Sequence, residues 1–241
     1  LRKGKVNEIK ESAFMKANKF YISDGEKKLS NDKELIDDLI KICEFTEKYE
    51  DSFLKSTKTV RRKNYWFVQS GFTNQKQCDD LPEELISNLK SSLLKSDIIK
   101  VANSFFKCEF SVVNIKSWIF YPLKIKTDGD VKVHYDAGLP KGTLKIMFYK
   151  GKFIEQPALT ILSENKNEFN IEGKNPLVLF ESNKLEHGAP APKIRPRPTV
   201  EMTLLPRFSS EVIFQQAGMH AGVPRNPFKN FTSTRVTFLS S

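Results

Sequence analysis

From about Phe105 onward, the chain consists of short runs that are apolar or that alternate between apolar and polar residues, separated by glycine, proline, asparagine and aspartate. Successive side chains of a strand point to opposite faces of a sheet, so such alternation is typical of a half-buried strand. Many short strands bounded by turn residues indicate an all-β barrel or sandwich. The runs are SVVNIKSWIFY, TLKIMFY, ALTILS, PLVLFES, TVEMTLL, EVIFQQ and RVTFLS. We therefore expect residues 105–241 to form a mainly β core.

The first hundred residues carry a helical pattern instead. A helix is expected at residues 31–50, where Asn31 suits an N-cap and Glu34 follows three residues later, ahead of a broad apolar face. A second helix is expected from Pro82 to about Leu94, because proline suits the first turn and leucines recur every four residues. Both helices are expected to support one outer face of the sheet.

Composition limits the organisation of the chain. With 241 residues, of which 39% are hydrophobic and 11% aromatic, the chain is long enough to bury one substantial core. It has no internal repeat and no long linker, so residues 1–241 are expected to form a single domain in which residues 1–104 support the β core. There is no run of about 18 apolar residues and no signal segment, which predicts a cytoplasmic protein without a membrane contact. The sequence carries no signal for an oligomeric state.

The three cysteines lie singly, without a C-x-x-C pair or a nearby histidine. This pattern does not fit a zinc ribbon or a disulfide framework. We expect each cysteine to be a small apolar residue in or near the core of a protein in a reducing compartment.

The net charge of +10 raises the question of nucleic-acid binding. The segment KSTKTVRRKNYWF, residues 55–67, is where a basic cluster meets aromatic residues, but we interpret it as a basic loop that leads into a strand. From Lys193 onward there are seven basic and two acidic residues, a net of +5. A positive site entrance at that end would attract an anionic ligand.

Two of the three histidines occur in a pattern that suits a metal ion. In the segment KVHYDAG, His134 and Asp136 project from the same face if the segment is a strand. His187 lies on a distant strand-like segment and would complete a set of two histidines and one carboxylate. Such a facial triad leaves positions open for other ligands and marks non-haem Fe(II) oxygenases. His220, the third histidine, is expected in a surface loop.

The segments around these ligands resemble the Fe(II)/2-oxoglutarate-dependent dioxygenase superfamily, in particular its prolyl-4-hydroxylase-like members. IFYP precedes the first ligand as a Tyr-Pro step does in those members, and GTLKIMFYKG follows it like the strand after H-x-D. NPLVLFESNKLEHGAPA resembles the family segment that carries the distal histidine. The resemblance extends from about Ile119 to Thr203. It implies a double-stranded β-helix, a jelly-roll or cupin-like core, with His134, Asp136 and His187 as ligands of Fe(II).

The resemblance also implies the residues that bind 2-oxoglutarate. Arg197 is the expected anchor for the distal carboxylate, since a guanidinium group can bind a carboxylate with two parallel hydrogen bonds. Thr199 has the same strand parity and would add a hydroxyl, as in the Arg-x-Ser/Thr pairs of the family. Arg195 has the same parity as well and is the alternative anchor. Tyr121 would contact the cosubstrate with its phenol, or else would only fill the core at a strand end.

These parts predict an Fe(II)- and 2-oxoglutarate-dependent hydroxylase that uses O2, acts on a small molecule or a peptidyl proline, and releases succinate and CO2. Because related halogenases lack the carboxylate ligand, Asp136 argues against halogenation. The first alternative is an AlkB-like oxygenase that removes alkyl groups from nucleic acid, which the positive charge suggests. The second alternative is a non-catalytic β-barrel that binds a sugar, a partner or a metal.

Overall fold

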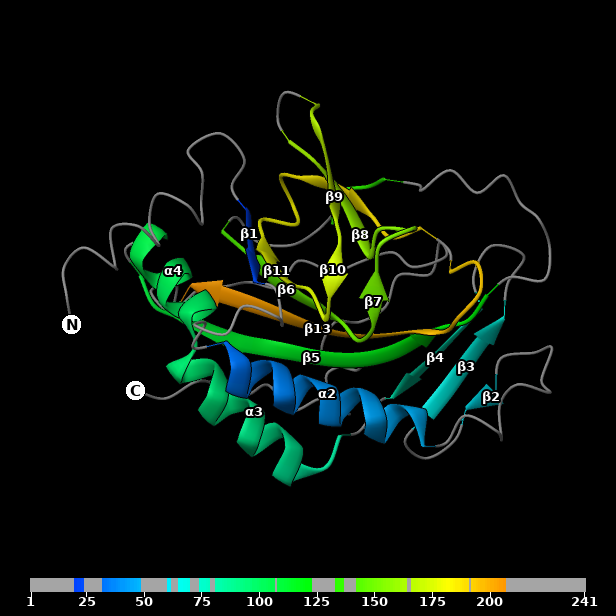
Figure 1. The fold of residues 1–241 in the computed structure, drawn as a ribbon. Coiled ribbons are helices and arrows are strands. Elements are labelled where there is room, and N and C mark those ends of the chain that lie inside the picture. Colours follow the sequence, from blue (N-terminus) through cyan, green and yellow to red (C-terminus); the bar gives the residue numbers. More distant parts are fainter. Residues whose placement is uncertain are drawn as a thin grey trace.

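A computed structural model gives the fold (Figure 1). It describes residues 20–23, 32–48, 60–61, 65–69, 74–78, 81–106, 108–122, 133–136, 142–163, 166–190 and 192–206. The helices are α2 (Lys33–Glu47), α3 (Glu83–Lys95) and α4 (Asp97–Phe106). The strands are β1 (Phe20–Ser23), β2 (Val60–Arg61), β3 (Tyr65–Gln69), β4 (Asn74–Cys78), β5 (Phe110–Phe120), β6 (Leu144–Tyr149), β7 (Lys152–Phe153), β8 (Leu159–Leu162), β9 (Glu168–Ile171), β10 (Gly173–Lys174), β11 (Leu177–Phe180), β12 (Glu186–Gly188) and β13 (Arg197–Pro206).

The largest sheet has eight antiparallel strands in the order β1-β11-β6-β13-β5-β4-β3-β2. Its long central strands β5 and β13 pair over their whole length, with one register shift between Thr203 and Leu204. On its other edge, β13 pairs with β6. Nine of the ten residues of β13 are buried, so both of its faces are covered. This central position explains why TVEMTLL carries long apolar side chains on one face of the strand.

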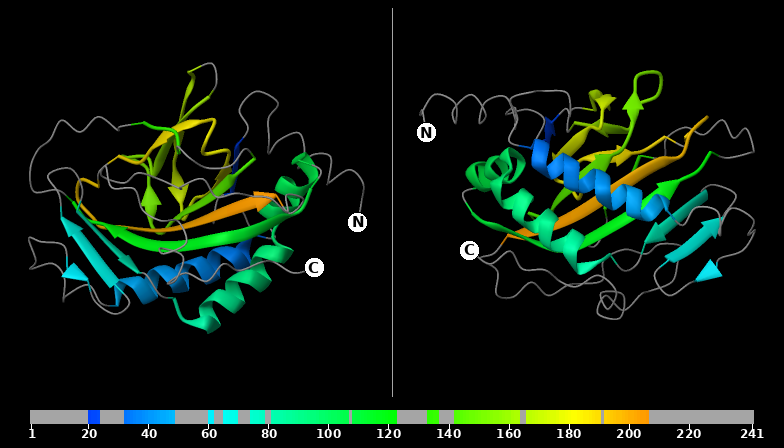
Figure 2. Two further views of the ribbon diagram at one scale, coloured as in Figure 1. Left: turned by 180° about the vertical axis from the view of Figure 1, so that it is seen from behind. Right: turned by 60° about the horizontal axis from the view of Figure 1, so that its bottom comes forward.

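A smaller sheet, in the order β12-β8-β9, lies across one face of the large sheet (Figures 1 and 2). A single bridge joins His134 to His187 of β12, so residues 133–136 extend this sheet without forming a regular strand. Two antiparallel sheets that face each other in this way form a jelly roll, which is the double-stranded β-helix expected from the sequence. The sequence prediction of fold class is therefore confirmed.

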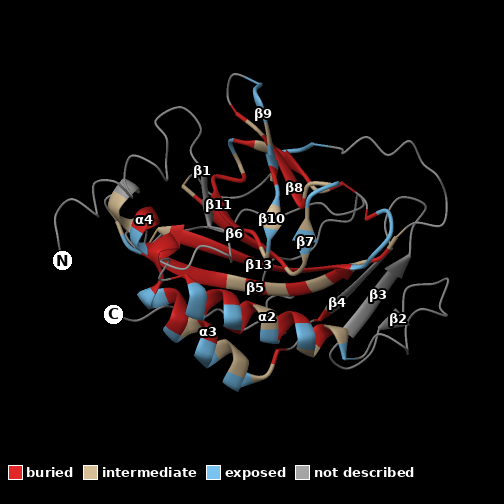
Figure 3. Cartoon of the chain, in the orientation of Figure 1, coloured by how far each residue is buried: buried red, intermediate tan, exposed pale blue. Residues whose placement is uncertain are grey.

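The helices cover the opposite face of the large sheet. Helix α2 packs along β5 and β13, and α3 packs against α2 (Figure 2). On this side, helix residues such as Leu35 and Leu89 pack with strand residues such as Leu204 in one buried cluster. The Thr46 and Ser117 hydroxyls, 2.7 Å apart, connect α2 to β5 within it. Figure 3 shows the exposed residues of α2 and α3 on the side away from the sheet. The predicted support of one outer face is thus confirmed.

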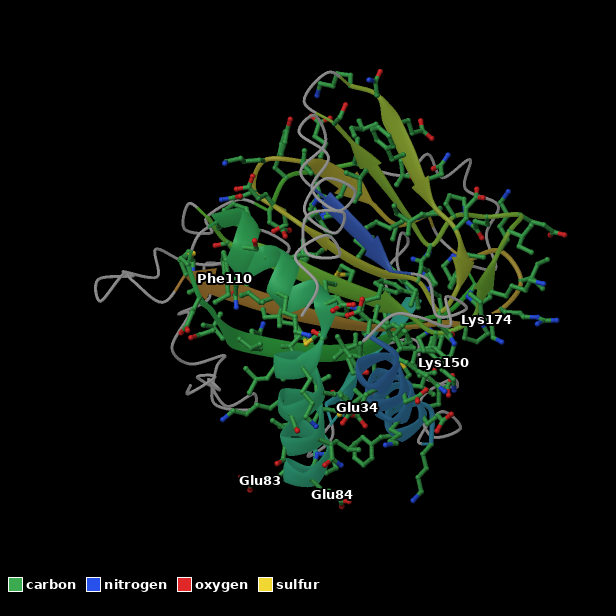
Figure 4. All side chains as sticks on the ribbon, turned by 60° about the vertical axis from the view of Figure 1, so that its left-hand side comes forward. Glu34, Glu83, Glu84, Phe110, Lys150 and Lys174 are labelled. Carbon is green, nitrogen blue, oxygen red and sulfur yellow. The ribbon has the colours of Figure 1, made fainter. Side chains whose placement is uncertain are left out.

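The start of α2 differs from the prediction, because Asp32 is its N-cap and makes no side-chain bond to that helix. Its carboxylate instead accepts hydrogen bonds from the backbone N–H groups of Asp97 and Ile98, at 2.8 and 3.0 Å, and so caps α4. Asn31 lies outside the described residues. Helix α3 begins as expected after Pro82, and Figure 4 shows Glu83 and Glu84 in its exposed first turn.

Five of the predicted runs form strands β5, β6, β8, β11 and β13. EVIFQQ, RVTFLS and His220 lie outside the described residues, as does part of the basic segment 55–67. The sequence did not predict helix α4 or strands β1, β2 and β4, whereas the strand into which the basic segment was expected to lead corresponds to β3. Cys43 and Cys78 are buried and Cys108 is half-buried, as expected for small apolar residues. Among the described helices, none has the length and apolar character needed to cross a membrane.

Candidate metal centre

The backbone brings His134, Asp136 and His187 together at one end of the smaller sheet. His134 and His187 exchange two backbone hydrogen bonds, each 3.0 Å long, and the N–H of Asp136 donates to the carbonyl of Ser182 at 2.9 Å. Three points of attachment therefore fix the segment that carries the first two side chains. His134 and Asp136 thus point towards the same side, as expected from the sequence, although they belong to a short bridged segment and not to a regular strand.

The potential ligand atoms of these three residues all lie within 4.8 Å of one another. His134 Nε2 is 3.8 Å from Asp136 Oδ1, and His187 Nε2 is 3.8 Å from Asp136 Oδ2. One cation placed among them is within reach of two imidazole nitrogens and a carboxylate oxygen. This donor set suits a first-row divalent metal and matches the facial triad of non-haem Fe(II) sites.

The ring of His187 is held in the tautomer that metal binding requires. Its Nδ1 lies 3.0 Å from the carbonyl oxygen of Leu185, and because a carbonyl only accepts, Nδ1 carries the proton. The Nε2 lone pair is then free to bind a cation. Burial, followed by the charge of Lys145, lowers the pKa of His187 to about 4. The imidazole is consequently neutral at physiological pH, which is the state that binds metals.

Asp136 contacts a buried lysine that the sequence analysis did not identify. Lys145 of β6 forms ion pairs with Asp136 Oδ2 and, at 3.4 Å, with Glu201 Oε2 of β13. Burial acts to raise the pKa of Asp136, but Lys145 and then His187 bring it below its ordinary value. Burial acts to lower the pKa of Lys145, whereas Glu201 and Asp136 raise it above its ordinary value. The carboxylate and the ammonium therefore both remain charged.

Arg197 begins β13 and is 3% exposed, whereas Arg195 is exposed. The Nη1 of Arg197 donates to the carbonyl of Pro190, and the guanidinium carbon of Arg197 lies 5.1 Å from the ring centre of Phe120. Burial holds the pKa of Arg197 below its ordinary value. The Nε of Arg197 has no hydrogen-bond partner among the described residues, and no described carboxylate pairs with the guanidinium. A buried cation of this kind is suited to bind an anionic ligand.

Two neighbours extend this cationic position. Thr199 is fully buried on the same face of β13 and pairs with Tyr149 at the end of β6. The Tyr149 ring centre lies 5.9 Å from the Arg197 guanidinium, and its hydroxyl has no hydrogen-bond partner in the described part of the chain. The sequence analysis missed Tyr149, although its position at the strand end in FYKG was a usable signal.

Tyr121 is 4% exposed and belongs to the buried cluster on the helix side of the sheet. This position fits the alternative in which Tyr121 only fills the core at the end of a strand. The residues of the site belong to the other face, where Tyr149, Phe180 and their neighbours form a second buried cluster between the two sheets. The proposed contact of Tyr121 with a cosubstrate gains no support from this placement.

The two histidines differ in their access to solvent. The His134 side chain is 58% exposed and that of His187 is 6% exposed. His187 packs edge-on against Phe180, with ring centres 4.8 Å apart. Of the three potential ligands, His134 is therefore the one most open to solvent.

Comparison with solved structures identifies the same fold in several oxygenases. The non-heme α-ketoglutarate-dependent epimerase SnoN from nogalamycin biosynthesis aligns with a TM-score of 0.62 and 10% identity, over 98% of this chain and 99% of that chain. A second SnoN structure, in complex with Fe3+, α-ketoglutarate and nogalamycin RO, aligns with a TM-score of 0.60 and 9% identity, over 93% of each chain.

Two further oxygenases share the fold. The non-heme α-ketoglutarate-dependent carbocyclase SnoK aligns with a TM-score of 0.53 and 13% identity, over 85% of this chain and 84% of that chain. A putative 2OG-Fe(II) oxygenase family protein from Caulobacter crescentus aligns with a TM-score of 0.51 and 13% identity, over 85% and 83%. No protein-family model and no curated protein sequence matches this chain. At these identities the likeness establishes the fold, and the expected resemblance to the superfamily is confirmed at that level.

Proposed function

We propose that this protein is an Fe(II)- and 2-oxoglutarate-dependent oxygenase that hydroxylates a small molecule. The observation that carries the proposal is that one side of the large sheet brings together a triad of potential ligands and a buried arginine without a carboxylate partner among the described residues. A metal ion and a dicarboxylate together satisfy both features. Neither feature is needed to stabilise a jelly roll, because each buries polar groups at a cost.

Each residue then has a defined role. His134, Asp136 and His187 hold Fe(II), with the Leu185 carbonyl orienting the His187 ring. Arg197 binds the distal carboxylate of 2-oxoglutarate through the edge of the guanidinium that carries Nε, as the alternative Arg195 is exposed. When bound, the iron and the cosubstrate supply the oxidising chemistry with O2 and release succinate and CO2.

The Tyr149 and Thr199 hydroxyls are the proposed additional donors to that carboxylate, because both residues lie on the same face as Arg197. The buried apolar residues of this face, including Phe180 and Met147, limit the access of water to the inner part of the site. A dry pocket strengthens the pairing between the guanidinium and the carboxylate.

A small-molecule substrate is supported by the fold neighbours, since SnoN and SnoK are enzymes of nogalamycin biosynthesis. SnoN is an epimerase and SnoK is a carbocyclase, so this fold carries outcomes other than hydroxylation. A peptidyl proline is the alternative substrate for the same site. Identification of the product distinguishes these outcomes.

The first experiment is an anaerobic titration of metal-free protein with Fe(II) and 2-oxoglutarate. The chelate gives a weak metal-to-ligand absorption band, which should appear in the wild type and disappear in Asp136→Ala. Asp37→Ala, an exposed aspartate on α2, is the matched control and should keep the band. Succinate release in air, measured with the same three proteins, provides the second measurement.

A folded wild-type protein without the band would contradict the proposal and favour the non-catalytic binding module. Tight, salt-sensitive binding of DNA or RNA by a protein that does give the band would favour the AlkB-like alternative instead.

A further inference from the structure

Lys145 lies between the half-buried carboxylate of Asp136 and the buried carboxylate of Glu201 at the candidate metal centre. Its Nζ forms ion pairs with Asp136 Oδ2 and, at 3.4 Å, with Glu201 Oε2. The side chains of Lys145 and Glu201 are each 9% exposed. Each of these buried charges needs a partner of opposite charge, because burial of a single unpaired charge is costly.

The strand register brings these groups together. Lys145 of β6 pairs with Thr203 of β13, and Glu201 pairs with Met147, so Lys145 and Glu201 are diagonal neighbours on the same face of the sheet. Phe180 lies opposite Lys145 on β11 and packs against the ring of His187. Apolar neighbours thus direct the long lysine side chain towards the triad.

Glu201 does not belong to the three residues whose ligand atoms lie within 4.8 Å of one another, but its ion pair with Lys145 links it to Asp136. Carboxylate oxygens bind the same divalent metals as Asp136 does, and this carboxylate reaches the ammonium that already contacts Asp136. Asp136 itself offers two oxygens to a metal. If Glu201 or both oxygens of Asp136 bound the ion, fewer coordination positions would remain for a chelating cosubstrate and for O2.

We propose that Lys145 keeps the protein's share of the metal site at three ligands, by occupying one oxygen of Asp136 and by pairing with Glu201. Lys145 is in this sense a positioning residue that touches a proposed ligand and not the reacting atoms. The inference rests on the proposed metal site. Because Lys145 and Glu201 carry opposite charges near the ion, they affect metal affinity in opposite directions.

The test is the affinity of the metal-free protein for Mn(II) alone, measured by electron paramagnetic resonance of the free ion. Lys145→Met should bind Mn(II) roughly tenfold more tightly or better. This is the size of effect on metal affinity that substitution of a residue beside a metal ligand has. Its Mn(II)-loaded form should bind 2-oxoglutarate more weakly than wild type. Glu201→Gln should weaken Mn(II) binding, because the ammonium then keeps Asp136 as its one carboxylate partner among the described residues and repels the ion more strongly. The double variant Lys145→Met/Glu201→Gln should return close to the wild-type affinity.

The outcomes separate this inference from the proposed function. Absence of Mn(II) binding by the wild type contradicts both. Binding by the wild type, with equal or lower affinity in Lys145→Met, leaves the metal site intact and overturns the inference about Lys145. If Lys145→Met fails to fold, the expected weakening in Glu201→Gln carries the test, and unchanged affinity in that variant overturns the inference.

Discussion

Replacement of Arg197 by methionine should abolish the response of the protein to 2-oxoglutarate. Arg197 is buried, its Nη1 is engaged by the Pro190 carbonyl, and its Nε has no partner in the described part of the chain. The edge that carries Nε can donate two charge-assisted hydrogen bonds to a carboxylate. Truncation of one partner of such a buried charge pair costs about 2–5 kcal/mol. At about 1.4 kcal/mol per factor of ten, the affinity should fall roughly 30-fold to 3,000-fold.

The assay is thermal unfolding of the Mn(II)-loaded protein with and without 2-oxoglutarate. A ligand at about one hundred times its Kd stabilises the folded state by about 2.7 kcal/mol. For a chain of 241 residues this corresponds to a rise in Tm of roughly 5–10 °C, from about 2–4 °C per kcal/mol. Arg197→Met should show little or none of that rise at the same concentration.

Arg195→Met is the matched control, since Arg195 is exposed and only two residues away. It should retain the full rise in Tm. Equal responses of the two variants to 2-oxoglutarate would refute the assignment, and so would a loss confined to Arg195→Met. Either result would mean that the buried guanidinium serves only to hold the Pro190 carbonyl and the neighbouring aromatic rings.

Three further predictions concern the same site. Folding lowers the pKa of His187 from its ordinary value of 6.5 to about 4, so the unfolded state binds the proton more readily. The metal-free protein should therefore lose about 3 kcal/mol of its free energy of unfolding, measured with urea, as the pH falls from 6.5 to 4. His187→Gln should flatten that pH dependence. Tyr149→Phe should change metal-free stability by less than about 1 kcal/mol, because the hydroxyl lacks a described partner, while calorimetry should show weaker 2-oxoglutarate binding. Addition of a chelator should lower the Tm of Mn(II)-loaded wild type and leave that of Asp136→Ala unchanged; equal shifts would contradict the role of Asp136.

Local pattern predicted much of the fold. The apolar periodicity of LIDDLIKIC and of ELISNLKSSLL indicated α2 and α3, and alternation indicated β5, β6 and β13. Helix α4 was missed because DIIKVANSFF resembles a buried strand as much as a short helix. Strand β4, NQKQC, is polar and lies towards the edge of the sheet, where the hydrophobic pattern is weak.

The candidate site was predicted only where residue types are distinctive. Histidine, aspartate and arginine at these spacings indicated a metal and an anion, and Arg197 was favoured over Arg195. Lys145 and Glu201 were not identified, because a charged residue within an alternating strand usually marks the solvent face. Their burial results from the smaller sheet that covers them, a tertiary effect that the strand pattern does not encode. The parity that Glu201 shares with Arg197 and Thr199 was the available signal.

The unequal exposure of the two histidines has a consequence for how quickly the proposed metal centre would exchange its ion. A metal leaves by successive replacement of its ligands by water, and water reaches His134 far more easily than His187. His134 should be the first ligand released and the last one bound, while Asp136 and His187 form the initial docking pair. The lifetime of the metal-loaded protein would then depend on how readily water replaces His134. A bound substrate that covers His134 would slow the release of the ion without itself becoming a ligand.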